Sequence, residues 1–220
     1  MMGHSRAAAV LGLCLLLTGC ATQDMPSRWS KLPADQRATM FGTVSADLTK
    51  GALSRYMIKF RNVDTKEEAW FSIYPGHDRS GDPELYERGR TVGVLFDLTL
   101  PPGRYEFFDI WMVAATGFGS TEWKAKTPFS VPFTIEPNTV NYLGELRAYM
   151  VLGKNIFGMT APGGAYWVVR DQETRDTAIF TKRRGGALSE PVRKIVLEVE
   201  RGDPFMRRTP LPPYDASAQN

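Results

Sequence analysis

Apolar and polar side chains alternate residue by residue in many short segments of this chain, from about Met40 onward. The clearest segment is 128–135, PFSVPFTI, in which every second side chain is aromatic or branched aliphatic. Because successive side chains of a β-strand point to opposite faces of its sheet, this spacing predicts a strand with one buried face. Pro128 and Pro132 share the other face, and proline lacks the backbone N–H that a central strand needs. The segment is therefore predicted to lie at the edge of a sheet.

The same alternation recurs along the chain, with turn signals between the segments. It predicts further strands at 56–60, 68–74, 92–100, 105–113, 140–148, 165–170 and 194–200. Pro102-Gly103 and Pro137-Asn138 each place a proline before a residue that tolerates positive φ, which is typical of type II turns. Short strands with turn signals about ten residues apart predict a mainly β chain, folded over 40–201 as a single antiparallel β-sandwich.

One short helix is expected near 171–184. Asp171 can cap its start, Glu173 suits its first turn, and the basic run 182–184 suits its last turn before Gly185. The segment 20–39 is polar, carries two prolines and shows no sustained periodicity, so we expect a tether. Fully extended, such a tether could reach roughly 60 Å. The proline-rich, polar segment 202–220 is expected to be a disordered tail.

The first residues have the composition of an export signal. Arg6 precedes an apolar run from Ala7 to Leu17, which is too short to span a bilayer core of about 30 Å. The run ends in Leu17-Thr18-Gly19-Cys20, which resembles the lipobox of bacterial lipoproteins. In that family a signal peptidase cuts before the cysteine, whose thiol then receives a diacylglycerol. The resemblance implies a leader at 1–19 and a lipidated Cys20.

The residue after the cysteine bears on the compartment. In such lipoproteins an aspartate there often signals retention in the inner membrane, and this chain has Ala21. The resemblance therefore implies a protein of the cell outer membrane, anchored by lipid on the periplasmic side. Two or three acyl chains make such an anchor effectively permanent, since each buried methylene contributes about 0.8 kcal/mol.

The body of the chain has a resemblance of its own. LPPGRYEF at 100–107 and PFTIEPNTVNYLGEL at 132–146 resemble segments of transthyretin-like or carboxypeptidase-regulatory-like sandwiches found in Gram-negative lipoproteins. The similarity extends over roughly 40–200, and an immunoglobulin-like sandwich is the alternative topology. Modules of this kind are usually non-catalytic, so the resemblance implies a protein that binds or braces.

Residues for catalysis are scarce. The chain has two cysteines and two histidines, and removal of the leader leaves Cys20 and His77. His77 is then the one histidine that a Ser-His-Asp site could use, and the chain has no Gly-x-Ser-x-Gly motif. Glu106 and Asp109 are three residues apart, which in a regular strand places them on opposite faces. We expect no catalytic site and no cofactor.

Metal binding has one candidate segment, Asp78–Glu84. Four oxygen-bearing side chains stand there at alternate positions, as in a calcium loop. However, Pro83 occupies the position where that loop needs glycine, and Gly89 the position where it needs a bidentate glutamate. We expect an acidic loop and no metal site, with calcium left open.

Charge and aromatic content indicate a binding role. With 27 basic and 24 acidic residues the chain is close to neutral, which argues against nucleic acid as a partner. Lys182, Arg183 and Arg184 could form a patch for anionic headgroups or an acidic partner, the alternative being a solvated helix face. Phe118 and Trp123, in the expected loop 114–127, could form a platform for a sugar or a protein. Core packing is expected for the other aromatic side chains considered, namely Phe108, Trp111, Phe157 and Trp167.

The sequence therefore predicts a lipid-anchored lipoprotein of the outer membrane that acts as a non-catalytic binding or scaffolding module of the envelope. Its expected partners are the membrane, through the anchor, and an envelope protein or a cell-wall glycan. Two alternatives stay open. One is an accessory lipoprotein of a secretion or transport assembly. The other is an envelope glycan hydrolase, which would need two carboxyl groups facing each other about 5–10 Å apart.

Overall fold

The computed structural model of the chain describes residues 23–50, 52–75, 85–87, 90–116, 119–186, 188, 190–200 and 203–211. Several sequence predictions lie outside these residues: the leader 1–19, Cys20, the loop Asp78–Glu84 with His77, Phe118, and the last part of the tail, 212–220.

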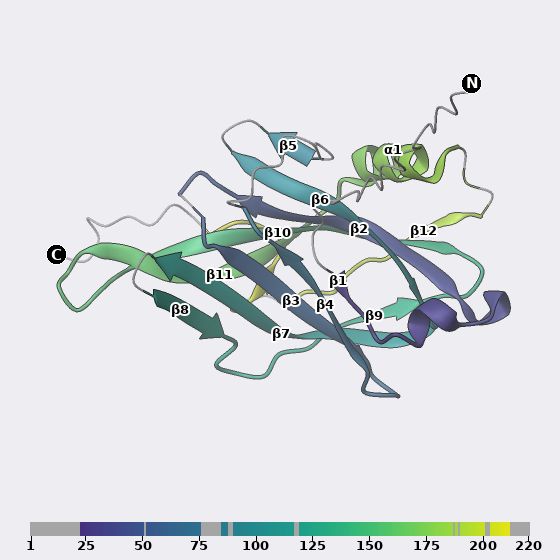
Figure 1. The fold of residues 1–220 in the computed structure, drawn as a ribbon, viewed down its shortest axis with the longest axis horizontal. Helices are drawn as coiled ribbons and strands as arrows, with labels where there is room; N and C mark the ends of the chain where they lie inside the picture. Colours follow the sequence, from purple (N-terminus) through teal and green to yellow (C-terminus); the bar gives the residue numbers. More distant parts are fainter. Residues whose placement is uncertain are drawn as a thin grey trace, which may run out of the picture.

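The fold is mainly β, with two sheets that face each other and one α-helix (Figure 1). Sheet A has the strand order β1-β4-β3-β7-β8, with β9 paired to β7. Its strands are β1 Gln23–Asp24, β3 Arg55–Asn62, β4 Glu68–Ile73, β7 Gly103–Thr116, β8 Gly119–Lys124 and β9 Val131–Ile135. Sheet B has the order β13-β11-β10-β2-β6-β5, with β12 paired to β10. Its strands are β2 Ala38–Asp47, β5 Leu85–Glu87, β6 Thr91–Leu100, β10 Val140–Lys154, β11 Thr160–Arg170, β12 Val192–Lys194 and β13 Met206–Arg207.

The hydrophobic core lies between the two sheets and is built by the predicted alternation. On β3, Tyr56, Ile58 and Phe60 are fully buried in it, and Leu98 of β6 meets them from sheet B. On β9, burial alternates along the strand and the two prolines at 128 and 132 are exposed. This strand pairs with β7 alone among the described strands, which confirms the edge position predicted from those prolines.

The prediction of a wholly antiparallel sandwich is wrong for part of sheet B. Strand β10 runs parallel to β2, with Val140 opposite Thr39, and β12 also runs parallel to β10. Strand β13 runs parallel to β11. Alternation along a strand reports which face is buried, and it carries no information about the direction of the neighbouring strand.

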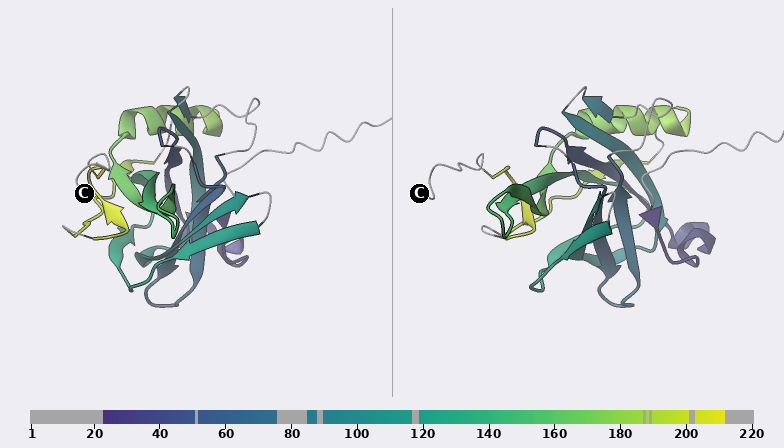
Figure 2. Two further views of the ribbon diagram at one scale, coloured as in Figure 1. Left: turned by 90° about the vertical axis from the view of Figure 1, so that its left-hand side faces the viewer. Right: turned by 60° about the vertical axis from the view of Figure 1, so that its left-hand side comes forward.

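The helix α1, Glu173–Arg184, confirms the helix expected near 171–184. Gly185 ends it in the left-handed conformation, with φ of 79°. At its start Gln172 is the N-cap residue, and Asp171 acts one position earlier by accepting a hydrogen bond from the Glu173 backbone N–H at 3.2 Å. The helix covers the side of sheet B that faces away from sheet A (Figure 2), where Phe180 stacks on Phe41 with ring centroids 4.3 Å apart.

The predicted tether and tail are in large part components of the body. Strand β1 pairs with β4, and the short 3-10 helices at Trp29–Lys31 and Ala34–Gln36 follow it. The Trp29 side chain is fully buried in the core, as is Met206 in β13. The prediction was wrong over 23–39 and 203–211, because a single large apolar side chain among polar residues can fix a segment without any periodic signal.

Candidate functional site

The outer face of sheet A is the open side of the described fold, since α1 packs against β2, β6 and β10 of the other sheet. Aromatic and cationic side chains stand on this face, at the strand positions that alternate with core residues such as Ile58 and Phe71. We call it the aromatic face. Its members are Arg55, Lys59, Arg61, Trp70, Tyr74, Phe108, Trp111 and Lys124. Each is half-buried except Lys124, which is exposed.

Trp111 is at the centre of a row of cation–π contacts on this face. The Arg55 guanidinium lies 5.0 Å from the ring centroid of Tyr74 and 5.3 Å from that of Trp111. On the other side the Lys124 ammonium lies 5.5 Å from the Trp111 ring. The indole N–H of Trp111 donates a hydrogen bond of 3.2 Å to the carboxylate of Glu122. These contacts hold the indole in place on the surface, so the expectation that Trp111 packs in the core was wrong.

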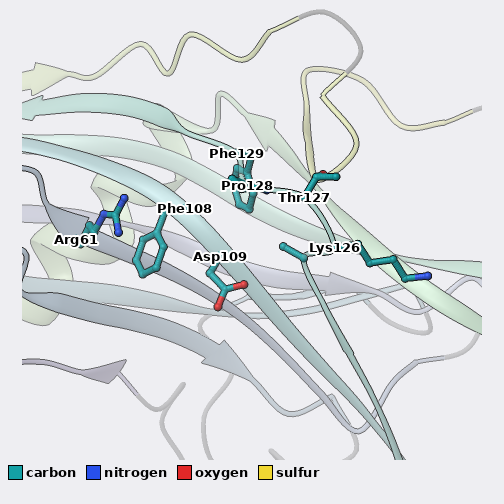
Figure 3. Close-up of a pocket in the computed structure, with 8 residues that line it drawn as sticks. Arg61, Phe108, Asp109, Lys126, Thr127, Pro128 and Phe129 are labelled. Carbon is teal, nitrogen blue, oxygen red and sulfur yellow. The ribbon is translucent and has the colours of Figure 1, made fainter.

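A groove of about 410 Å³ opens on the same face (Figure 3). It is lined by Arg61, Phe108, Asp109, Ala125, Lys126, Thr127, Pro128 and Phe129. The Arg61 guanidinium lies 4.4 Å from the centroid of the Phe108 ring, and Asp109 forms an ion pair of 3.3 Å with Lys59. The groove thus offers flat apolar surface beside charged donors and one carboxylate, which suits a ligand with both an apolar face and polar groups.

A β-bulge brings Glu106 and Asp109 to the same face, contrary to the prediction from their spacing. Phe60 is opposite Phe107 while Lys59 is opposite Asp109, so β7 carries an extra residue at this point. Glu106 accepts hydrogen bonds from Arg61 and Ser130. Burial alone would raise the pKa of Glu106, but these bonds and the Arg61 charge outweigh it and hold the pKa below its usual range. Glu106 is therefore an ionised partner that orients Arg61.

A second polar cluster lies buried beneath α1. Glu145 and Asp176 are 0% exposed and Arg147 is 4% exposed. Arg147 donates to Glu145 at 2.9 Å, and Arg175 of α1 lies 2.7 Å from Asp176 and 3.6 Å from Glu145. Burial raises the pKa of Asp176 and outweighs the opposing effect of Arg175. The cluster joins α1 to β10. Sequence analysis missed it, although two charged residues inside the largely apolar segment 140–152 were a signal of buried partners.

The basic residues of α1 have structural partners. Arg184 forms two hydrogen bonds with the carboxylate of Asp97, at 2.8 and 2.6 Å, and Arg183 donates to the backbone carbonyl of Leu95 at 3.1 Å. These three bonds fasten the end of α1 to β6. Lys182 is exposed. The predicted patch at 182–184 is thus on the sheet B side, where two of its three side chains hold the helix.

Trp123, expected in a loop, belongs to β8. It is half-buried and packs against the core, where it lies against Gly164 of β11. It is not grouped with the basic residues of α1. Trp111, on the neighbouring strand β7, is also half-buried, and its contacts lie on the outer face of sheet A.

The described ranges contain neither a cluster of metal ligands nor a helix that could span a membrane. No group of three or more His, Cys, Asp and Glu side chains there is arranged to hold a metal ion. Among the same residues no helix combines the length and apolar character that crossing a bilayer requires.

Comparison with known proteins gives no family. No family model matches the chain, and no curated protein matches it. Among solved structures, a leucine-rich repeat protein from Bacteroides thetaiotaomicron VPI-5482 is similar with a TM-score of 0.28 and 12% sequence identity. The match covers 53% of this chain and 14% of that chain, so this chain spans a small part of the matched protein. A similarity this low supports no conclusion about fold or function.

Proposed function

We propose that this protein is a lipoprotein of the outer membrane, anchored through Cys20 on the periplasmic side, that acts as a non-catalytic binding module for cell-wall glycan. The observation that carries this proposal is the aromatic face: Trp111 and Phe108 beside Arg55 and Arg61, on an open sheet next to a groove. A sugar ring stacks its apolar face on an aromatic side chain and bonds its hydroxyl groups to charged neighbours. We also propose that the body of the chain is a sandwich of the transthyretin-like kind.

The cations of the aromatic face favour a glycan that carries carboxylate or phosphate groups. Arg55 and Lys124 flank Trp111 on opposite sides, and Arg61 borders the groove. An anionic group next to a stacked sugar ring would form an ion pair with one of these cations. Charge complementarity of this kind adds orientation and specificity to stacking.

The carboxylates near the groove support binding rather than hydrolysis. A glycosidase needs one carboxyl group with a raised pKa as general acid and a second carboxylate across the bond. Asp109 is ion-paired with Lys59, and the pKa of Glu106 is held low by Ser130 and Arg61. Neither residue is arranged as a general acid.

The test is co-sedimentation of the full-length protein with purified cell-wall sacculi, together with crosslinking in cells followed by affinity purification. We expect the protein to sediment with sacculi, and Trp111→Ala combined with Arg55→Ala to reduce bound protein at least tenfold. Lys182→Ala, which changes an exposed cation on α1, is the matched control and should bind like the wild type. Recovery of one stoichiometric envelope protein, with no binding to sacculi, would instead indicate an accessory of a secretion or transport assembly.

A further inference from the structure

The loop between β10 and β11 presents three large apolar side chains to solvent. Ile156 is 93% exposed, Phe157 77% and Met159 58%. Core packing had been expected for Phe157, and the structure contradicts it, because the hairpin extends past the end of the sandwich (Figure 1). The three side chains stand together on a five-residue turn, 155–159, which we call the hairpin tip.

The backbone of the hairpin tip is closed by its own hydrogen bonds. The side-chain oxygen of Asn155 accepts from the backbone N–H groups of Phe157 and Met159, both at 3.0 Å. The backbone N–H of Gly158 donates to the Asn155 carbonyl, and that of Asn155 to the Met159 carbonyl, both at 2.9 Å. A segment that enters a lipid interface must satisfy its polar backbone groups internally, because hydrocarbon offers them no partner. The turn meets that requirement for four backbone N–H groups and two backbone carbonyls.

Acidic side chains are absent from the hairpin sequence itself between 146 and 170. No aspartate or glutamate occurs between Glu145 and Asp171, whereas Lys154 is exposed directly before the turn. An apolar tip preceded by a cation, in a hairpin whose own sequence from 146 to 170 has no acids, is complementary to phospholipid, whose headgroup phosphates lie just outside the acyl chains.

The hairpin tip and the start of β1 lie toward the same ends of the strands of sheet A. Gln23 is opposite Phe71 and Asp24 is opposite Trp70, so the chain approaches β1 from the end where β4 finishes at Ile73. Across sheet A, Ile73 aligns with Tyr56 and Met112, and Met112 with Trp123. Trp123 lies against Gly164, in the half of β11 nearest the tip.

The length of chain between the proposed anchor and the fold then limits how the body meets a membrane. Cys20 precedes Gln23 by three residues, which span about 10 Å when fully extended. A lipid on Cys20 would therefore hold the start of β1 close to the bilayer surface. We propose that the hairpin tip inserts its three apolar side chains into the lipid interface of the membrane that anchors the protein. This inference rests on the proposed lipid anchor.

A depth-sensitive fluorescent label tests the insertion. The thiol of Cys20 is blocked by the lipid, so a cysteine introduced by Phe157→Cys is uniquely reactive toward a polarity-sensitive fluorophore. The full-length lipidated variant is reconstituted in vesicles of phosphatidylethanolamine and phosphatidylglycerol, with or without lipids brominated near the headgroup. Thr174→Cys, at an exposed position on α1, is the matched control. We expect a blue-shifted emission and at least twofold quenching by brominated lipid for the label at 157, and neither effect for the label at 174.

A second variant tests the role of the neighbouring side chains. Ile156→Ser with Met159→Ser, in the Phe157→Cys background, should return the emission and quenching to the values of the control. Protein that floats with the vesicles but shows equal, solvent-like emission at both labels overturns the insertion and leaves the anchor intact. Protein that does not float contradicts the anchor, and with it both proposals. A third outcome is that the label at 157 emits as in solvent in the vesicles but is shielded from solvent in native envelope membranes. This outcome would indicate that the tip contacts a protein partner, and it would overturn the lipid proposal.

Discussion

The indole N–H of Trp29 donates a hydrogen bond of 2.9 Å to the carboxylate of Glu67, in the turn between β3 and β4. Arg28 forms an ion pair with the same carboxylate, and the Trp29 ring packs edge-on against Tyr105 with centroids 6.0 Å apart. The N-terminal part of the body is thereby fixed to sheet A. An anchor at Cys20 would hold the protein close to its membrane, rather than at the end of a tether of roughly 60 Å.

The first prediction concerns this attachment. Trp29→Ala should lower the free energy of unfolding by about 3–5 kcal/mol, because it removes a fully buried aromatic ring. Trp29→Phe keeps an aromatic ring and loses the hydrogen bond to Glu67, so a smaller cost of about 1–2 kcal/mol is expected. Urea unfolding followed by circular dichroism measures both values. If Trp29→Ala were as stable as the wild type, residues 23–39 would be a tether after all.

The second prediction tests the inward face of the edge strand β9. Phe133 is 5% exposed and stacks on Tyr105 with ring centroids 5.6 Å apart. Phe133→Ala should cost about 3–5 kcal/mol. Thr134→Ala, on the exposed face of the same strand, should change stability by less than about 0.5 kcal/mol. Equal melting temperatures for the two variants would contradict the orientation of the strand.

The third prediction concerns the close approach of β2 to β10 at Gly42. A β-carbon there would lie 2.4 Å from the backbone carbonyl oxygen of Gly144 and 2.7 Å from the Phe96 ring. The carbonyl belongs to the backbone and cannot move aside as a side chain could. Gly42→Ala should therefore cost about 3 kcal/mol. The same change at Gly153, where the nearest atom is 3.9 Å from the added carbon, is the control and should be close to neutral in thermal unfolding.

The fourth prediction is a pH dependence with two signs. Burial raises the pKa of Asp176 in the folded state, so the folded protein holds a proton that the unfolded chain releases near pH 4. Wild-type stability should fall relative to Asp176→Asn as pH rises from about 4 through that raised pKa. The hydrogen bond from Lys194 lowers the pKa of Asp171, so relative to Asp171→Asn the wild type should lose stability as pH falls below about 4. Urea unfolding at several pH values measures the free energy of unfolding of the wild type and of each variant. If a variant and the wild type changed in parallel with pH, the pKa shift inferred for that aspartate would be wrong.

The fifth prediction concerns the anchor. Cys20→Ser should leave the precursor uncut and release the protein from the membrane fraction, because the thiol proposed to receive the lipid is gone. Cys14→Ser, which changes the other cysteine within the apolar run of the leader, should be processed normally. Fractionation and the size of the mature chain on a gel report both outcomes. Normal membrane retention of Cys20→Ser would show that the lipobox resemblance is misleading.

Local patterning predicted the local structure of this fold well. The alternation at 128–135 gave the burial of Phe133 and the edge position of β9, and the basic run before Gly185 gave the end of α1. In the segment 194–200, Ile195 and Leu197 are buried as predicted, although β12 ends at Lys194. Each of these results depends on neighbours within a few residues.

Features that depend on distant partners were not predictable in this way. The parallel pairing of β2 with β10 leaves no trace in either segment. Glu145 looks like a surface residue until α1 is known to cover it. The bulge opposite Lys59 and Phe60 changes the face of Asp109, and with it the composition of the groove. Much of the candidate site therefore follows from register, which a single strand does not encode.

The place of β2 at the centre of sheet B has a consequence for export. Its two neighbours are β6 and β10, and Thr39 pairs with Val140, about a hundred residues later along the chain. A polypeptide that emerges from a translocon N-terminus first would therefore expose β2, which is buried over nearly its whole length in the finished fold, until most of the protein has followed. Contacts so distant in sequence slow folding and prolong the time in which an unpaired strand can join another chain. If the protein is exported as proposed, a holding factor that protects the early segment until β10 arrives would favour correct folding.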